Sequence, residues 1–302
     1  MNQPVLEVRH LRLSFQTISG RLQAVRDVSF SVAERETLAL VGESGCGKSA
    51  TCRAIMGLIA RTAVIEGGEI LLNGENLLTK SKKELRAIRG GRIAMIFQDP
   101  MTSLDPTMKI GRQITEAIRL HRRVSAAQAK ARALELLGLV GIEEPERRFG
   151  QYAHEFSGGQ RQRIGIARAL ATEPRFIACD EPISALDVSI QAQVVNLLRA
   201  LQRQRGLTYL FIAHDLSMVK YISDRIGVMW RGRIVEMGSA AEVCEHPIHP
   251  YTRSLISAIP QPDPRSERTR RRIPYQPDPK PGESLREVAP GHFVLCTEDF
   301  RI

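Results

Sequence analysis

The sequence predicts an α/β fold, in which short buried strands alternate with helices. Three observations carry this prediction. First, a short apolar run at 37–41 leads through a glycine-rich loop into a helical stretch. Second, similar apolar runs at 93–97, 176–179 and 207–213 have the length of buried strands. Third, residues 101–171 have a largely helical composition, and this helical segment separates the run at 93–97 from the run at 176–179.

The glycine-rich loop runs from Gly42 to Ser49 and fits the phosphate-binding pattern G-x-x-x-x-G-K-[ST] at every fixed position. Its glycines let the backbone turn its N–H groups inward, and the helix expected at 50–58 adds partial positive charge. Lys48 is expected to neutralise the outer phosphates of a nucleotide, and the Ser49 hydroxyl to hold Mg²⁺. A glycine-rich turn that binds nothing is the alternative, but the preceding strand and the Lys-Ser pair argue against it. The loop therefore predicts a nucleoside triphosphate site.

Length and hydropathy limit the class of protein. With 302 residues, the chain has room for one large domain, or for one domain plus an extension. No apolar run reaches the ~18 residues of a membrane span. Residues 1–4 do not begin a secretory signal, so none is expected. Five scattered cysteines without a C-x-x-C pair argue against a disulfide framework or a zinc site, and favour a reducing cytosol.

The charge balance leaves several partners open. Lys and Arg number 43 against 33 acidic residues, which gives a net charge of +10. Such an excess suits nucleic acid, an anionic membrane surface or nucleotide phosphates, and an ordinary solvated surface is an equal alternative. The aromatic content of 5%, without interleaving of aromatic and basic residues, weakens the case for a single-strand nucleic-acid binder.

Strands are expected before the loop. Residues 5–41 mix apolar with polar side chains, and Val28–Val32 alternates with a period of two. Residues 18–21 suit a turn between two strands. The ring of Phe15 is suited either to stacking on an adenine base or to an ordinary place in a strand core, and the residues alone leave both open.

Helices and strands alternate after the loop. Residues 82–89 have a charged helical pattern, and the buried run 93–97 ends at Gln98. The Ala- and Leu-rich segment 126–139 predicts a helix that ends near Gly141.

A second glycine-rich segment precedes a helix. Ser157, Gly158, Gly159 and Gln160 come before the helical run 164–171. A Ser-Gly-Gly sequence at a helix start offers backbone N–H groups and partial positive charge to an anion. Taken alone, it is more often a simple helix cap.

Two adjacent acids, Asp180 and Glu181, end the apolar run 176–179. Because successive strand residues point to opposite faces, the two carboxylates need not share a role. Asp180 is placed to reach Mg²⁺, and Glu181 to orient a water molecule. The alternative is an acid that caps the next turn, which is the weaker reading downstream of a phosphate-binding loop.

Residues 184–236 are expected to form a helix, a buried strand and a hairpin. Ser184–Asp187 precede an amphipathic helix at 190–201. The buried run 207–213 ends in His214, although a lone histidine at a strand end is more often structural than catalytic. Residues 226–236 predict a hairpin with a turn at Arg231-Gly232.

The composition changes from Pro260 onward. Eight of the sixteen prolines lie between residues 260 and 290, and Arg268 and Arg270–Arg272 form a basic cluster. These features predict an extended, loop-rich appendix rather than a second packed domain. The basic cluster is expected to be a solvated face, and a docking patch for acidic lipid head groups or a partner subunit is the alternative.

Taken together and in this order, the motifs resemble those of the ABC ATPases over about residues 5–255. The matching pieces are the loop Gly42–Ser49, Gln98, Ser157–Gln160, Asp180-Glu181, Ser184–Asp187 and His214. Finer features resemble the oligopeptide/dipeptide uptake branch of ABC transporter ATP-binding subunits. They are the stretches 98–106, 184–193, 246–252 and 290–294.

The resemblance implies the fold of a P-loop NTPase of the ABC nucleotide-binding type. It has a mostly parallel core sheet, an antiparallel β subdomain and an inserted α-helical subdomain at about 101–171. The ATPase domain would span 1–255 and the proline-rich C-terminal extension 256–302. Many relatives carry a cysteine cluster in this extension that suits an iron–sulfur centre. This tail has only Cys296, with Cys244 far upstream, so no iron–sulfur cluster is expected.

The resemblance also implies roles for individual residues. ATP would be bound by Phe15, Gly42, Glu43, Ser44, Gly45, Cys46, Gly47, Lys48, Ser49, Ala50 and Gln98. Mg²⁺ would be held by Ser49, Gln98 and Asp180. Glu181 would polarise the attacking water, and His214 would contact the γ-phosphate. Two subunits would face each other head to tail, so that Ser157, Gly158, Gly159 and Gln160 contact the partner's ATP and Asp187 contacts the opposite subunit.

The function implied is ATP hydrolysis that drives import of oligopeptides or dipeptides, or of a similar solute such as a nickel complex. The expected partners are a second ATPase subunit that is a paralogue, two membrane permease subunits and, indirectly, an extracytoplasmic solute-binding protein. The chain would lie peripherally on the cytoplasmic face of the inner membrane, where helices at about 101–155 border a groove for a short permease helix. No nucleic-acid partner is expected.

The alternative is a non-transport ABC ATPase that acts on nucleic acid or ribosomes. Chains of that class usually carry long coiled coils, zinc sites or two fused ATPase halves. This sequence has one half, no sustained heptads and no cysteine pairs.

Overall fold

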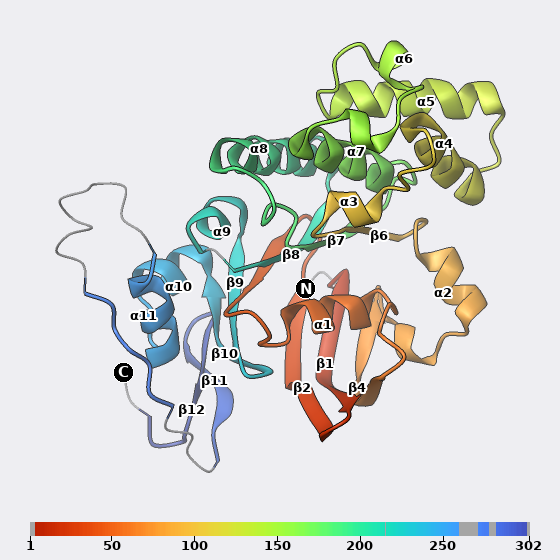
Figure 1. Cartoon of the computed structure of the whole chain (residues 1–302). Helices are drawn as coiled ribbons and strands as arrows, with labels where there is room; N and C mark the ends of the chain where they lie inside the picture. The colour runs from red at the N-terminus through yellow and green to blue at the C-terminus, as the bar shows by residue number, and fades with distance from the viewer. Residues whose placement is uncertain (1–3, 215, 260–270, 278–281, 301–302) are drawn as a thin grey trace. The chain divides into compact units, whose positions relative to one another are not determined.

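The computed structural model (Figure 1) describes residues 4–214, 216–259, 271–277 and 282–300. The chain divides into two compact units. The first unit comprises Met1–Glu75 and Phe211–Ile302, and the second comprises Asn76–Leu210. The glycine loop belongs to the first unit, and the two acids at 180–181 belong to the second.

An antiparallel sheet forms from the alternating residues near the N-terminus of the first unit. Its long strands are β1 (Leu6–Thr17), β2 (Gly20–Val32) and β4 (Ala63–Leu72), with the two-residue β5 (Glu75–Asn76) beside β4. Strand β1 pairs with both β2 and β4. The side chains of Val28, Phe30 and Val32 are buried, whereas those of Ser29 and Ser31 are half-buried, so the period-two pattern is confirmed. The predicted turn falls between β1 and β2.

A second sheet in the first unit carries the glycine loop at the end of one strand. Within this unit its order is β11 (Ser284–Ala289), β12 (His292–Cys296), β10 (Arg233–Ser239), β9 (Arg225–Trp230) and β3 (Thr37–Val41). Strand β3 runs parallel to β9, and the other neighbours are antiparallel. The predicted hairpin at 226–236 is confirmed as β9 and β10. All five residues of β3 are buried, which gives the loop a rigid base.

Short helices complete the first unit. They are α1 (Lys48–Ile55), α9 (Leu216–Ile222), α10 (Ala240–Glu245) and α11 (Pro250–Ser257). The helix after the loop begins two residues earlier than predicted and ends before residue 58. Its start follows Gly47, whose left-handed conformation turns the chain into the helix, and Gly57, with φ 61°, follows its end.

The described part of the C-terminal tail is more ordered than its prolines predict. The prediction of a loop-rich appendix is wrong for residues 284–296, because they form the β11–β12 hairpin and pair with β10. Buried and half-buried residues alternate along β12, which gives the hairpin a core-facing side. Within the predicted basic cluster, Arg271 and Arg272 are exposed, while Arg268 and Arg270 lie outside the described residues.

The second unit combines parallel strands with a helical region (Figure 1). Strand β6 (Ile93–Ile96) runs parallel to β7 (Phe176–Asp180). The helices are α2 (Lys82–Ile88), α3 (Pro100–Ser103), α4 (Ile110–His121), α5 (Ala126–Leu139), α6 (Pro145–Arg148), α7 (Gly158–Leu170) and α8 (Val188–Arg205). Helices α4, α5 and α7 pack on one another through buried apolar side chains. No helix in the described ranges is long and apolar enough to cross a membrane.

Two helices of the second unit extend beyond their predicted bounds. Helix α8 covers Val188–Arg205, whereas 190–201 was predicted. Helix α7 begins at Gly158, six residues before the predicted start, so both glycines lie in its first turn. Ser157 and Gln160 form a reciprocal capping box, which supplies acceptors to two backbone N–H groups and so starts the helix here. The parallel strand pairs, the antiparallel β1–β2–β4 sheet and the helical region confirm the predicted α/β class.

Candidate functional site

The glycine loop adopts a backbone that only glycine accommodates at two of its positions. Gly42, Gly45 and Gly47 have φ values of 146°, 78° and 106°. A Cβ added to Gly42 would lie 2.2 Å from the carbonyl oxygen of Met229, and one added to Gly47 would lie 2.4 Å from that of Ala24. Close backbone neighbours and positive φ therefore both require glycine here.

Lys48 lies folded back over the loop. Its side chain is only 3% exposed, and its Nζ donates hydrogen bonds to the carbonyl oxygens of Gly42 and Glu43 at 2.7 and 2.9 Å. Within the described chain, the backbone N–H groups of Gly45 and Gly47 have no intramolecular acceptor. A buried ammonium group and backbone N–H groups without an internal acceptor, at a helix N-terminus, are groups that phosphate oxygens can bind.

Neighbouring segments hold the loop from outside. The Gly232 N–H, in the turn between β9 and β10, donates to the Cys46 carbonyl oxygen at 2.9 Å. The Thr51 hydroxyl donates to the Gly47 carbonyl oxygen at 2.9 Å. The Glu43 N–H donates to the hydroxyl of Tyr251, which belongs to α11, at 3.1 Å. The shape of the loop thus depends on segments far along the chain.

The Cys46 side chain is part of this buried loop. Burial raises the pKa of its thiol, and the neighbouring Lys48 partly opposes that rise. Its Sγ lies 3.7 Å from the Lys48 Nζ. A neutral thiol is therefore the expected form at pH 7.

Other predicted nucleotide residues of the first unit lie at its surface. Ser44 and Gly45 are exposed, while Ser49 and Ala50 are half-buried in the first turn of α1. Phe15 is half-buried in β1, where it pairs with Leu22 on one side and Ala63 on the other. His214 is exposed directly after β8 (Thr208–Ala213).

In the second unit, the structure joins two predicted residues directly. The side-chain amide of Gln98, just after β6, donates to the Glu181 Oε2 at 2.8 Å. Glu181 has a φ of 48°, which is an uncommon conformation for this residue type. The N–H and hydroxyl of Ser184 both donate to the Glu181 carbonyl oxygen, at 3.2 and 3.1 Å. Contacts on both its side chain and its backbone therefore hold Glu181.

Asp180 ends β7 and is only 1% exposed. The donors predicted for Mg²⁺ are a hydroxyl, an amide and a carboxylate, which are the oxygen ligands that this hard cation prefers. Since the Gln98 nitrogen is engaged with Glu181, its oxygen is the atom suited to a cation. In the described ranges, no three His, Cys, Asp or Glu side chains cluster in a way that could hold a metal ion by themselves.

The second glycine-rich segment opens toward solvent. Ser157 and Gly158 are exposed, whereas Gly159 is buried against α8. A Cβ on Gly159 would lie 2.6 Å from the Cγ2 of Ile190, so the absence of a side chain allows α7 and α8 to approach closely. Asp187 is exposed at the N-cap of α8.

The predicted residues thus fall into two groups. The loop, Phe15 and His214 belong to the first unit, and the others belong to the second. Tyr251 and Gly232 were missed as loop contacts. A signal for Tyr251 was present in the His-Pro-Ile-His-Pro-Tyr stretch, but its contact lies 208 positions away in sequence.

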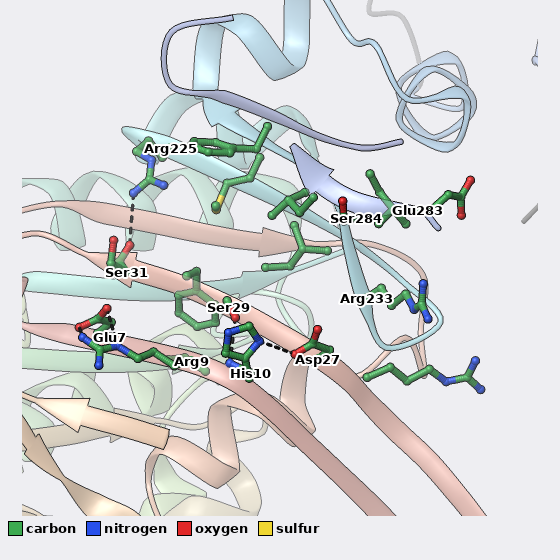
Figure 2. A pocket seen from close by; sticks show the side chains of 18 residues that line it. Glu7, Arg9, His10, Asp27, Ser29, Ser31, Arg225, Arg233, Glu283 and Ser284 are labelled. Carbon is green, nitrogen blue, oxygen red and sulfur yellow. Dashed lines mark hydrogen bonds and ion pairs between the residues drawn. The ribbon is translucent and has the colours of Figure 1, made fainter. Parts of the chain in front are cut away.

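A cavity of about 600 Å³ in the first unit lies apart from the predicted site. Residues of β1, β2 and β9–β12 line it, and Figure 2 shows some of its polar groups paired with one another. His10 Nδ1 lies 2.8 Å from Asp27 Oδ1, and Arg225 donates to the Ser31 carbonyl oxygen at 3.2 Å. No residue of the predicted nucleotide site lines this cavity, so it does not compete as the catalytic centre.

A second depression lies in the helical region of the second unit. It has a volume of about 650 Å³ and is lined by residues 101–106 and by parts of α4 and α7. Met101 and Leu120 on its wall are 56% and 73% exposed. Large apolar side chains left in solvent on the wall of a groove are typical of a docking surface for another chain.

Comparisons with known proteins agree with these motifs. A family profile described as ABC transporter matches residues 25–184. Another, described as Oligopeptide/dipeptide transporter, C-terminal region, matches residues 235–283. The chain is 55% identical to the oligopeptide transport ATP-binding protein OppF of Bacillus subtilis (strain 168), over 99% of this chain and 98% of that protein. It is 52% identical to the dipeptide transport ATP-binding protein DppF of Lactococcus lactis subsp. cremoris, over 99% and 96%.

Solved structures show the same fold. The dimeric structure of MJ0796, described as a bacterial ABC transporter cassette, matches with a TM-score of 0.70 and 26% identity. The match covers 78% of this chain and 98% of that chain. A dimeric post-hydrolysis state of the same cassette, bound to ADP and Pi, matches equally well.

Proposed function

The chain belongs to the ABC transporter family, and we propose that it is the ATP-hydrolysing subunit of an importer of oligopeptides or dipeptides. The proposal rests on one observation, namely that two features occur together in this chain. The first is a glycine loop of the phosphate-binding pattern whose buried Lys48 donates to the carbonyl oxygens of Gly42 and Glu43. The second is a C-terminal region of the oligopeptide/dipeptide transporter type. The loop accounts for the use of ATP, and the C-terminal region for the class of transporter.

The loop supplies the binding energy for the nucleotide. Its N–H groups and Lys48 would bind the β- and γ-phosphates, and Phe15 would stack on the adenine. Ser49, Gln98 and Asp180 would hold Mg²⁺, which neutralises charge on the phosphate oxygens when it is bound. These oxygen donors fit that cation.

Glu181 would orient the attacking water. The Gln98 amide fixes one of its carboxylate oxygens at 2.8 Å, and Ser184 fixes its backbone. A held carboxylate loses less freedom when it positions a water molecule for in-line attack. His214 would contact the γ-phosphate.

A second ATPase subunit, proposed to be a paralogue, would complete each site. The exposed Ser157 and Gly158 begin α7 and would present its N-terminus to the γ-phosphate held by the partner's loop. Asp187 would contact that partner. Because the γ-phosphate would bridge the two subunits, its loss on hydrolysis would let them separate.

The movement of the two ATPase subunits toward and away from each other would be transmitted to two membrane permease subunits. The depression walled by Met101 and Leu120 is proposed as the seat of a short cytoplasmic permease helix. The chain would then lie peripherally on the cytoplasmic face of the inner membrane, with an extracytoplasmic binding protein as an indirect partner. In this arrangement residues 1–255 serve as the ATPase domain and 256–302 as its extension.

The first test concerns catalysis. Glu181→Gln should reduce ATP hydrolysis at least ~100-fold, because general-base assistance contributes about that much or more, while ATP binding persists. The variant should also accumulate as an ATP-bound dimer on size-exclusion chromatography. Glu146→Gln, at an exposed glutamate of α6, serves as the control. Hydrolysis near the wild-type rate in Glu181→Gln would contradict the catalytic role.

The second test concerns transport. The full chain, purified with its permease subunits and reconstituted in proteoliposomes, should import labelled oligopeptide only with ATP and the binding protein present. Lys48→Ala should abolish ATP binding and import, whereas Lys82→Ala, at an exposed lysine of α2, should preserve both. Co-purification with nucleic acid or ribosomes instead of permease subunits would favour the non-transport class.

A further inference from the structure

The phosphate-binding loop is braced by a side chain from the C-terminal part of the chain. Tyr251 is only 2% exposed, and its hydroxyl accepts a hydrogen bond from the Glu43 N–H at 3.1 Å. Glu43 directly follows Gly42, where the chain leaves β3. The contact therefore fixes the first peptide of the loop and leaves the N–H groups of Gly45 and Gly47 without an internal acceptor among the described residues.

Tyr251 is itself held on several sides. Its N–H donates to the Nδ1 of His249 at 3.1 Å, at the start of α11. Its ring packs on Trp230 at 6.1 Å and edge-to-face on Tyr275 at 5.4 Å between ring centres. Burial raises the pKa of the Tyr251 hydroxyl, so it stays neutral and can share this hydrogen bond at physiological pH.

A buried carboxylate ties this segment to the C-terminal hairpin. Glu236 in β10 is fully buried, and it accepts hydrogen bonds from the N–H groups of Ile248 and His249 at 2.8 and 3.0 Å. The third donor is His292 in β12, whose Nε2 lies 2.8 Å from the Glu236 Oε1. A buried carboxylate needs such donors, so loss of one disturbs the others. His292 thus helps to place the peptide that leads into Tyr251.

We propose that Tyr251 is a positioning residue of the nucleotide site, and that the C-terminal hairpin, through His292 and Glu236, holds it in place. A loop already held in its binding shape loses less conformational freedom when phosphate arrives, so affinity rises. The C-terminal segment is thereby a structural part of the ATP site. The proposal rests on the proposed function, because it assumes that the loop binds ATP.

The experiment compares two single-hydroxyl deletions in the full-length chain. Tyr251→Phe keeps the ring and removes only the brace. Tyr209→Phe is the matched control, because Tyr209 is also buried, belongs to the second unit, and donates to the Leu198 carbonyl oxygen at 3.2 Å. Loss of one net hydrogen bond should raise the ATP dissociation constant of Tyr251→Phe by about two- to tenfold. Tyr209→Phe should lower the melting temperature without changing that constant.

Two further readouts separate positioning from general stability. In Tyr251→Phe the KM for ATP should rise by more than kcat falls. Hydrogen exchange of the Glu43 amide should accelerate without nucleotide in both Tyr251→Phe and His292→Gln. If the two residues act through one network, the double variant should weaken ATP binding by less than the product of the single effects.

The outcomes distinguish the two proposals. An unchanged ATP dissociation constant and unchanged Glu43 exchange in Tyr251→Phe, with normal binding by the wild type, would overturn the brace alone. Failure of the wild-type chain to bind ATP would overturn the proposed function. Weaker binding in Tyr209→Phe equal to that in Tyr251→Phe would assign the effect to general destabilisation and also overturn the brace.

Discussion

Gly47 is one of two residues of the loop, with Gly42, at which positive φ and a close backbone neighbour both require glycine. Its φ of 106° and the 2.4 Å approach to the Ala24 carbonyl both exclude a side chain, whereas Gly45, with φ 78°, has no atom within 4 Å of an added Cβ. Gly47→Ala should therefore cost about 2–4 kcal/mol of unfolding free energy, and Gly45→Ala only about 1 kcal/mol. Urea denaturation of the two variants measures the difference. Equal losses would show that the loop relaxes around the added methyl group.

The residues of the loop were predictable because their spacing is local. The Gln98–Glu181 hydrogen bond was not, since 83 positions separate the two residues and no periodic pattern relates them. Sequence motifs identified the chemistry of each residue. Their contacts depend on which strands become neighbours, as with β6 and β7.

Two helices of the second unit begin with a capping box made of Ser and Gln. Ser125 with Gln128 starts α5, and Ser157 with Gln160 starts α7. Replacing either serine with alanine should cost about 1 kcal/mol of unfolding free energy, because a helix N–H loses its acceptor. Only Ser157→Ala should also reduce ATP hydrolysis, since only α7 is proposed to contact nucleotide. A matching loss of hydrolysis in Ser125→Ala would contradict that assignment.

The start of α11 carries a titratable cap. Burial lowers the pKa of His249 to about 4 from an ordinary value of 6.5. Between pH 4 and pH 6.5, His249 therefore binds a proton in the unfolded chain but not in the folded chain. Stability should be complete above pH 6.5 and fall by up to about 3 kcal/mol as pH approaches 4.

Denaturation from pH 7 to pH 4 measures this dependence. His249→Asn retains a side-chain acceptor for the Tyr251 N–H but does not titrate, so its stability should fall less steeply with decreasing pH. Identical pH profiles for the two proteins would assign the loss to other groups. This pH dependence arises within a single element, because His249 acts as the N-terminal cap of α11.

The C-terminal hairpin shows where prediction of elements failed. The many prolines from residue 260 onward indicated loops, and this obscured the alternating burial of β12. Gly291, with φ 73°, sits in the turn between the two strands and was the available signal. A short edge strand has few residues, so its alternating pattern is a weaker signal than the high proline content of the surrounding segment.

At the scale of the whole molecule, all five cysteines are free thiols. Burial raises the pKa of Cys46, Cys179, Cys244 and Cys296, and Cys244 alone among the five is not fully buried. Brief alkylation of the native protein should therefore label Cys244 first, as read by peptide mass spectrometry. Reducing agent should leave the melting temperature unchanged. Early labelling of Cys46 or Cys179 would contradict the buried loop and strand described here.

The sequence predicted the α/β class and the family more completely than the arrangement of the chain. Class and family follow from local motifs and from their order. The sheet of the first unit instead joins residues 37–41 to strands more than 180 positions later. Such non-local pairing leaves no local periodic signature, so the motif around Tyr251 did not show that it contacts the loop, and nothing indicated the contact from Gly232.

The pairing of β3 with β9 also sets the order in which a growing chain acquires its parts. The loop is translated early, yet Leu38–Val41 find their parallel partners only in residues 225–228. The Tyr251 hydroxyl that holds the loop comes later still. Because a chain leaves the ribosome N-terminus first, a product of premature termination carries the complete glycine motif without the segments that shape it. Such truncated products would compete poorly with full-length subunits for cellular ATP.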